Sequence, residues 1–454
     1  MTMRVSWLFD LAAAVALVAT AAPASAQTPQ APGADPVQAT RPGGRPFRGI
    51  FGGGLGNTEQ TLTFTGTLGG GYESDYLAAL VGDDSALGRP ARGGAVGVGS
   101  ATVAYSLGRE RASISAAATS SAFYYERAGD TLTQSHRFTS SQGLQIARRT
   151  RVSATEYVNR QPFRLDRLFP AAQDFSFGAP PALPSDSFAG AEEYVDLGAD
   201  ADISHQISER LSVSGGVSHW SSEWSADSRR TFTGGRAGVG VSIARGTSVR
   251  LGYGRYQSRY VDGGAERLVR HDNIDVGLDY AGAISLTRRT RLSFGTGSNA
   301  IHDRDETHFR LTGRAQLDRE IGRTWVAAIA YARDAYYVDQ LQDVVLSDSV
   351  TFSMGGLLSR RVSLHSGVGA SFGNVGFGQA SNDAYATYAI AGLVTALTRL
   401  TALGVDYTYY LHSFGADITL PGGVVREIDR QSIRAYITVW APLFSRIRSP
   451  HATR

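Results

Sequence analysis

Hydrophobic and polar residues alternate along most of the chain, and the stretch Ile274–Gly297 shows this pattern clearly. Its first half places apolar side chains at every second position: Ile274, Val276, Leu278 and Tyr280. A short polar turn follows at Thr287–Thr290, and alternation then resumes at Leu292 and Phe294. A period of two residues is the period of a β-strand, and only antiparallel strands can be joined by so short a turn. The stretch is therefore predicted to form a β-hairpin.

The chain repeats this hairpin from Glu59 to its end. The predicted short turns are Gly108–Arg111, Arg148–Thr150, Ser208–Arg210, Ala244–Thr247, Thr287–Thr290, Ile321–Thr324, Ser359–Arg361 and Thr398–Leu400. Longer polar loops separate them at Leu77–Arg92, Ala128–Asp130, Gln161–Gly190, Glu223–Asp227, Asp262–Glu266, His302–Glu306, Asp339–Asp343, Asn374–Asn382 and Ser413–Gly423. Eight turns and nine loops join eighteen strands. Short turns on one side and long loops on the other are typical of an outer-membrane barrel.

The predicted fold class is all-β, an antiparallel transmembrane β-barrel of about 18 strands. A repeat of about 40 residues also suits a soluble propeller, but each propeller blade needs four short strands. Here each repeat holds two segments of roughly 10–16 residues, as long as tilted membrane-spanning strands require. Within these segments Leu311 alternates with Arg310, and Leu197 alternates with Asp196. In a membrane barrel the apolar face is outside and the polar face lines the interior.

Four segments are predicted along the chain. Residues 1–26 have the form of a secretory signal peptide, with Arg4 before an apolar core and an A-x-A cleavage site before Gln27. The apolar run is too short to be a membrane anchor. Residues 27–58 form a Pro/Gly-rich periplasmic linker, residues 59–444 form the barrel, and residues 445–454 form a C-terminal tail. Phe444 is the candidate for a terminal aromatic insertion signal.

Composition narrows the function classes. The 454 residues include no Cys, and all 44 basic residues are Arg, which leaves a formal charge of +3. The absence of Cys excludes disulfides and thiolate metal sites. A near-neutral balance lacks the clustered basic footprint of nucleic-acid binding, so no nucleic-acid partner is expected.

Aromatic residues gather in clusters that are predicted to lie toward the loop ends of the strands. Amphipathic rings favour the headgroup level of a bilayer, so such clusters are expected to form an interfacial girdle. The alternative is ordinary strand propensity. The clusters are Phe123–Tyr125, Tyr253 with Tyr256 and Tyr260, Tyr331 with Tyr336 and Tyr337, Tyr407 with Tyr409 and Tyr410, and Trp220 with Trp224.

No catalytic, cofactor-binding or metal-ligating residue can be nominated, because no nucleophile, base and orienting group occur together. The protein is therefore not expected to be an enzyme. Charged residues of both signs fall on the predicted polar faces, where they either tune pore selectivity or pair across neighbouring strands. These candidate lumen-lining residues are Asp196, Asp200, Asp202, Arg236, Arg250, Asp275, Asp279, Arg310, Arg314, Asp318, Asp406, Arg430 and Arg434.

The turns that combine Ser or Thr with Arg, in LTRRTRLSFG, LSRRVSLHSG and LTRLTALGVDY, and the ending AYITVWAPLF resemble the beta-barrel porin type 2 family. The resemblance covers Glu59–Phe444. Members of this group resemble barrels associated with exopolysaccharide export, which implies an outer-membrane channel for polar solute and polysaccharide cargo. It also implies outer-membrane lipid and a periplasmic polysaccharide-export partner as contacts. A general diffusion (nutrient) porin is the near alternative, and an outer-membrane enzyme is a more remote one.

Overall fold

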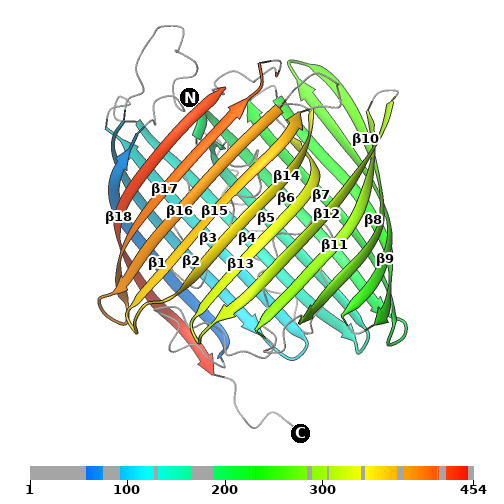
Figure 1. Cartoon of the computed structure of the whole chain (residues 1–454), viewed down its shortest axis with the longest axis horizontal. Coiled ribbons are helices and arrows are strands. Elements are labelled where there is room, and N and C mark those ends of the chain that lie inside the picture. Colours follow the sequence, from blue (N-terminus) through cyan, green and yellow to red (C-terminus); the bar gives the residue numbers. More distant parts are fainter. Residues whose placement is uncertain are drawn as a thin grey trace, which may run out of the picture.

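Figure 1 shows a closed barrel of tilted β-strands in the computed structural model of this chain. The structure describes residues 58–74, 93–126, 131–164, 188–225, 228–244, 246–283, 289–303, 306–338, 343–375, 383–416, 418 and 426–447. Eighteen strands lie within these ranges: β1 Thr58–Glu73, β2 Gly94–Gly108, β3 Ala112–Tyr125, β4 Thr131–Ala147, β5 Thr150–Arg164, β6 Phe188–Gln206, β7 Leu211–Ser225, β8 Ser228–Ala244, β9 Thr247–Asp262, β10 Ala265–Ala283, β11 Thr290–Asp303, β12 Glu306–Ile321, β13 Trp325–Val338, β14 Asp343–Leu357, β15 Val362–Val375, β16 Asp383–Ala396, β17 Thr401–Phe414 and β18 Glu427–Ile447.

Closure of the barrel follows from the pairing of its first and last strands. Each strand pairs antiparallel with its neighbours in the chain, and β18 pairs antiparallel with β1 through partners such as Leu68 and Ile437. A closed sheet leaves no free edge, so its backbone groups can all be paired within the wall. The predicted antiparallel barrel of eighteen strands is confirmed. The described residues contain no helix long and apolar enough to cross a membrane.

Alternation along each strand separates an apolar outer face from a polar inner face. On β12, the side chains of Phe309 and Leu311 are 67% and 75% exposed. On β6, Leu197 is 44% exposed, whereas the neighbouring Asp196 is only 5% exposed. A water-soluble barrel would bury its apolar residues, so an apolar exposed face requires a lipid environment.

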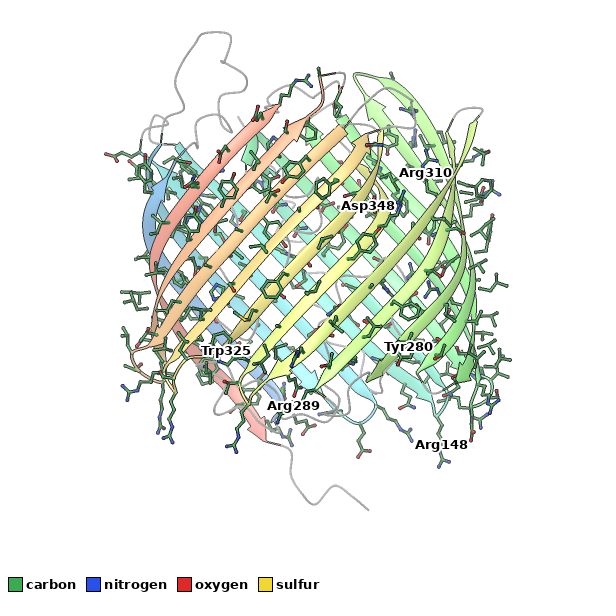
Figure 2. The ribbon with its side chains drawn as sticks, viewed as in Figure 1. Arg148, Tyr280, Arg289, Arg310, Trp325 and Asp348 are labelled. Carbon is green, nitrogen blue, oxygen red and sulfur yellow. The ribbon has the colours of Figure 1, made fainter. Side chains whose placement is uncertain are left out.

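Strands end and begin on either side of all eight predicted short turns, and residues 245 and 284–288, which belong to or adjoin the turns predicted at Ala244–Thr247 and Thr287–Thr290, lie outside the described residues. The Ile274–Gly297 hairpin is formed by β10 and β11, where the rings of Tyr280 and Phe294 stack with centroids 5.5 Å apart. The short turns lie at one end of the barrel. Figure 2 shows Arg148 and Arg289 at this turn end, with Arg310 and Asp348 nearer the opposite end.

Several loops at the other end are shorter than predicted. The expected loop Asp262–Glu266 is reduced to Gly263 and Gly264, whose φ angles of +54° and +84° suit a tight two-residue hairpin turn that favours glycine. The loops predicted at Glu223–Asp227 and His302–Glu306 also lose residues to strands. Polar residues beyond the apolar segment continue to form backbone pairs across the hairpin, so both strands extend into the residues that were predicted to be loop.

The predicted segment limits are only partly covered by the described residues. Residues 1–57 and 448–454 lie outside them, including the predicted signal peptide and all of the linker except Thr58. β1 begins at Thr58 and β18 continues to Ile447, three residues past the predicted end of the barrel at Phe444. The predicted loop Gln161–Gly190 is shorter by the residues that β5 and β6 take from its two ends, and residues 165–187 are outside the described ranges.

Three outward tyrosines make hydrogen bonds on the outer face. Tyr253, Tyr331 and Tyr407 each lie six residues after the first residue of their strand, β9, β13 and β17 respectively. Their hydroxyls hydrogen-bond across the outer face, with distances of 2.6 Å from Tyr253 to Asp272 and 2.6 Å from Tyr331 to Asp348. These tyrosines lie midway along their strands, and exposed apolar residues such as Phe309 and Leu268 lie beyond them toward the loop end.

Candidate functional site: the inner wall of the barrel

The inner face is the face on which side chains from separated strands converge. The Arg434 guanidinium carbon of β18 lies 5.9 Å from the ring centroid of Phe123 on β3, although β1 and β2 run between these strands. Side chains on the concave side of a closed sheet approach one another, whereas those on the convex side diverge. Arg434 and Phe123 therefore identify the inner face. By strand alternation, all thirteen charged residues singled out from the sequence lie on this face, opposite the exposed apolar side chains.

The first charged group joins β6, β7 and β8. Nη2 of Arg236 donates to both carboxylate oxygens of Asp202, at 2.6 and 2.7 Å. Nη1 of Arg236 donates to Ser218 Oγ at 3.3 Å, and Ser218 Oγ in turn donates to Asp200 at 2.5 Å. Asp202 and Arg236 are both register partners of Gly216 on β7. A Cβ at Gly216 would overlap the Asp202 carboxylate, so the ion pair can cross β7 only because this position is glycine.

The second group joins β9, β10 and β12. The Arg250 guanidinium donates to both Asp275 and Asp279, and Nη2 of Arg314 lies 4.0 Å from Asp279. Asp279 and Arg314 are both register partners of Gly295 on β11, so this contact also passes over a glycine. One arginine held by two carboxylates, with a second arginine nearby, leaves no large field of either sign.

A third crossing lies on the opposite part of the wall. His365 Nε2 of β15 is 3.5 Å from Asp406 Oδ1 of β17, and the two side chains are 4% and 8% exposed. Gly392 of β16 lies between them in register. Pairing across neighbouring strands, one of the two roles that the sequence allowed for these charges, occurs between Arg250 of β9 and Asp275 of β10, and three further contacts each span one intervening strand. Concave curvature and a glycine in the middle strand make that reach possible.

The seam between β1 and β18 carries a residue that the sequence did not single out. The Glu73 side chain is 0% exposed and accepts hydrogen bonds from both Arg430 and Arg434. Glu73 is the register partner of Ser432, so the two arginines flank it along β18. A buried carboxylate bound by two guanidiniums strengthens the closure of the barrel. The signal for Glu73 was weak, because it is the last residue of its strand and adjoins a polar loop.

The remaining candidates have local contacts. Asp196 accepts hydrogen bonds from Ser222 Oγ at 3.1 Å and from Asn159 Nδ2 at 3.4 Å. Asp318 accepts one from Gln316 Nε2 at 2.8 Å, and Arg310 Nη1 donates to the backbone oxygen of Phe309 at 3.1 Å. Within the described residues, no group of three or more His, Asp or Glu side chains is arranged to hold a metal ion.

The outer and inner faces of the barrel show which environment surrounds it. A closed wall, an exposed apolar outer face and a charged inner face fit a lipid bilayer and not water. The protein is a bacterial outer-membrane β-barrel. No protein-family model matches the chain, and no curated protein matches it in sequence. The likeness to the beta-barrel porin type 2 family therefore remains a resemblance.

Solved barrels with similar architecture are distant. OccK2 (OpdF) of Pseudomonas aeruginosa, crystallised with glucuronate, is 10% identical with a TM-score of 0.44, over 85% of this chain and 99% of that one. OpdO of Pseudomonas aeruginosa is 12% identical with a TM-score of 0.41, over 86% and 99%. The siderophore receptor PirA of Acinetobacter baumannii is 6% identical with a TM-score of 0.44, over 85% and 81%. Similarity at this level says nothing about what this barrel carries.

The inner wall of the barrel also holds aromatic residues that the sequence assigned to a girdle. Trp220 stacks on Phe232 with centroids 5.1 Å apart, and Phe232 stacks on Tyr256 at 5.2 Å. The Arg230 guanidinium carbon lies 4.2 Å from the Trp220 ring centroid and 5.0 Å from that of Tyr260. The girdle prediction is thus wrong for Trp220, Tyr256 and Tyr260. Alternation could have revealed this, because Trp220 shares its strand face with Ser218 and Ser222.

Proposed function

We propose that this barrel is a channel through which polar, hydroxyl-rich solute crosses the outer membrane. A barrel of eighteen strands encloses a lumen wide enough for an aqueous path unless loops fill it. The observation that carries the proposal is the pairing of charges on the inner wall. Arginines and carboxylates meet in mixed groups: Arg236 with Asp202, Arg250 with Asp275 and Asp279, and Glu73 with Arg430 and Arg434. The wall is therefore polar without a strong field of one sign, which suits cargo that is hydrated and weakly charged.

A hydroxyl-rich surface on one part of the wall supports the same reading. Thr and Ser side chains of β1–β4 line a shallow hollow, with Trp440 of β18 at its side. Hydroxyls both donate and accept hydrogen bonds, so they can exchange contacts with sugar hydroxyls as readily as with water. The residues are Thr61, Thr63, Ser106, Ser115, Thr139 and Ser141.

The cargo that we propose is exopolysaccharide leaving the cell, in keeping with the family resemblance of the sequence. A general diffusion porin is the alternative, since a polar, balanced wall suits small nutrients as well. An outer-membrane enzyme is the least favoured class, because the carboxylates of Asp202, Asp275 and Glu73 are all occupied by arginines.

Deletion of the protein in its native cell separates export from nutrient uptake. If the barrel exports polysaccharide, the deletion strain should lose surface polysaccharide, measured by sugar analysis of the cell surface, while uptake of small sugars is unchanged. Complementation with the wild-type chain should restore the polymer. Normal surface polysaccharide with slowed small-sugar uptake would exclude export and favour the general porin.

A further inference from the structure

Exposed arginines encircle the turn end of the barrel. Seven of its short connections, those after β2, β4, β6, β10, β12, β14 and β16, each carry at least one exposed arginine among the described residues. The described residues of these turns include ten arginines and two glutamates, Glu110 and Glu209. We call the ten arginines the turn-end collar: Arg109, Arg111, Arg148, Arg149, Arg210, Arg289, Arg323, Arg360, Arg361 and Arg399. Figure 2 shows two of them, Arg148 and Arg289, extending from this end of the barrel.

In several of these turns a Ser or Thr hydroxyl makes the hydrogen bonds that close the turn, and the arginine side chains are exposed. In the turn after β14, Ser359 Oγ accepts hydrogen bonds from the backbone amides of Arg361 at 3.2 Å and Val362 at 3.1 Å. The hydroxyl thus closes the turn, as Ser and Thr commonly do, and the guanidiniums are not needed for it. Leu358 in the same turn is 54% exposed. Ser208 and Thr398 close the turns after β6 and β16 in the same way, beside Ile207 and Leu397, which are 47% and 52% exposed.

The exposed aliphatic side chains next to the arginines place the turn-end collar at the surface of the bilayer. An exposed aliphatic side chain favours the acyl region, so the arginine beside it lies at the level of the headgroups. Trp325 confirms the level, because it opens β13 and its Nε1 donates to the Leu357 backbone oxygen at 3.2 Å. Figure 2 shows Trp325 near the turn end of the wall. Tryptophan favours the membrane–water interface.

The two ends of the barrel differ in how their charges are satisfied. Toward the loop end, arginines on the outer face have acidic neighbours: Arg229 with Glu223 at 3.6 Å, Arg259 with Glu266 at 2.8 Å, and Arg333 with Asp348 at 3.6 Å. In the collar, the described residues form one ion pair, between Arg109 and Glu59 at 2.8 Å. Positive charge is therefore uncompensated at the turn end, where an external anion can bind.

We propose that the turn-end collar binds the phosphate groups of anionic glycerophospholipids in the periplasmic leaflet. Short turns of outer-membrane barrels lie on the periplasmic side, and the collar lies at headgroup level. A guanidinium presents a planar fork of donors that matches phosphate, which an ammonium does not. Basic residues at a bilayer surface are attracted to anionic lipids. The collar would select phosphatidylglycerol over zwitterionic lipid around the whole circumference of the barrel.

Quenching of Trp325 by brominated lipid tests this selection directly. The folded full-length protein, with Trp7, Trp220, Trp224 and Trp440 changed to Phe so that Trp325 is the single tryptophan, is reconstituted in phosphatidylcholine vesicles that contain brominated phosphatidylglycerol or brominated phosphatidylcholine at equal fractions. Brominated phosphatidylglycerol should quench several-fold more strongly, and added salt should reduce the difference. Neutralising the nearby collar by Arg323→Gln, Arg360→Gln and Arg361→Gln should remove the preference.

The matched control neutralises three arginines at the loop end, by Arg229→Gln, Arg255→Gln and Arg259→Gln, and should leave the preference unchanged. Equal quenching by the two brominated lipids in the Trp325 protein would overturn the proposal, as would a preference that survives the collar substitutions. At matched ionic strength, sodium phosphate should reduce the preference more than sodium chloride does, because it offers the guanidiniums the same acceptor group as the lipid. Equal competition by the two salts would contradict binding through the phosphate group. Competition by phosphate for a site at which brominated phosphatidylglycerol shows no preference would show that the collar binds free phosphate and does not select lipid.

Discussion

At the scale of single residues, glycine decides which charges meet on the inner wall. Asp202 and Arg236 are 34 residues apart in the chain and meet across Gly216. His365 and Asp406 meet across Gly392 in the same way. Alternation in the sequence predicts that each of these charged residues lies on the polar face. It could not predict the partners, because they depend on register, on curvature and on the residue of the strand between them.

A single methyl group tests this role of glycine. A Cβ at Gly392 would overlap both the His365 ring and the Asp406 carboxylate. Gly392→Ala should therefore lower stability by about 1–3 kcal/mol, the usual cost of overpacking, measured by urea unfolding in detergent or lipid. Gly235→Ala is the control, since its Cβ would meet only the Gly216 backbone oxygen at 3.7 Å. Equal stability of the two variants would contradict the account.

At the scale of strands and turns, the sequence was most informative where apolar residues alternate. Every short turn was predicted from alternation broken by Ser, Thr and Arg. Strand bounds at the loop end were harder to predict, because the polar strand extensions, such as those beside Gly263–Gly264, have the composition of a loop. Aromatic clusters were misleading for a related reason. Neighbouring residues in a strand point to opposite faces, so Tyr124 is 43% exposed outside while Phe123 and Tyr125 are buried inside.

The two faces of one strand should respond oppositely to the same substitution. Ile329 is 50% exposed on the outer face of β13, between Trp325 and Tyr331. Ile329→Arg should destabilise the barrel by roughly 2–4 kcal/mol, the cost of arginine near the bilayer midplane. Ala328→Arg, one residue away, places the guanidinium on the inner face beside its register partner Asp318 and should assemble normally. Assembly in lipid is measured by the heat-modifiable shift on a semi-native gel. A normal Ile329→Arg barrel with a misassembled Ala328→Arg barrel would reverse the assignment of faces.

At the scale of the whole molecule, the barrel combines an asymmetric exterior with a balanced interior. Outside, ten arginines gather at the turn end with one ion pair among the described residues, and several arginines toward the loop end are paired with carboxylates. Inside, arginine and carboxylate meet in networks that include Arg236 with Asp202 and Arg250 with Asp275. The eighteen strands and their closure were predictable from the regular spacing of the turns. The sequence showed charged residues of both signs on the polar faces, but it did not show which arginine pairs with which carboxylate.

Electrical recording in planar lipid bilayers tests the channel most directly. The purified, folded protein should insert in discrete steps of ionic current, because the eighteen-stranded wall encloses an aqueous path. Under a potassium chloride gradient the reversal potential should lie close to zero, since paired charges on the inner wall favour neither ion. A folded barrel that gives no current would contradict a channel, and a reversal potential near the limit for one ion would contradict the balanced wall.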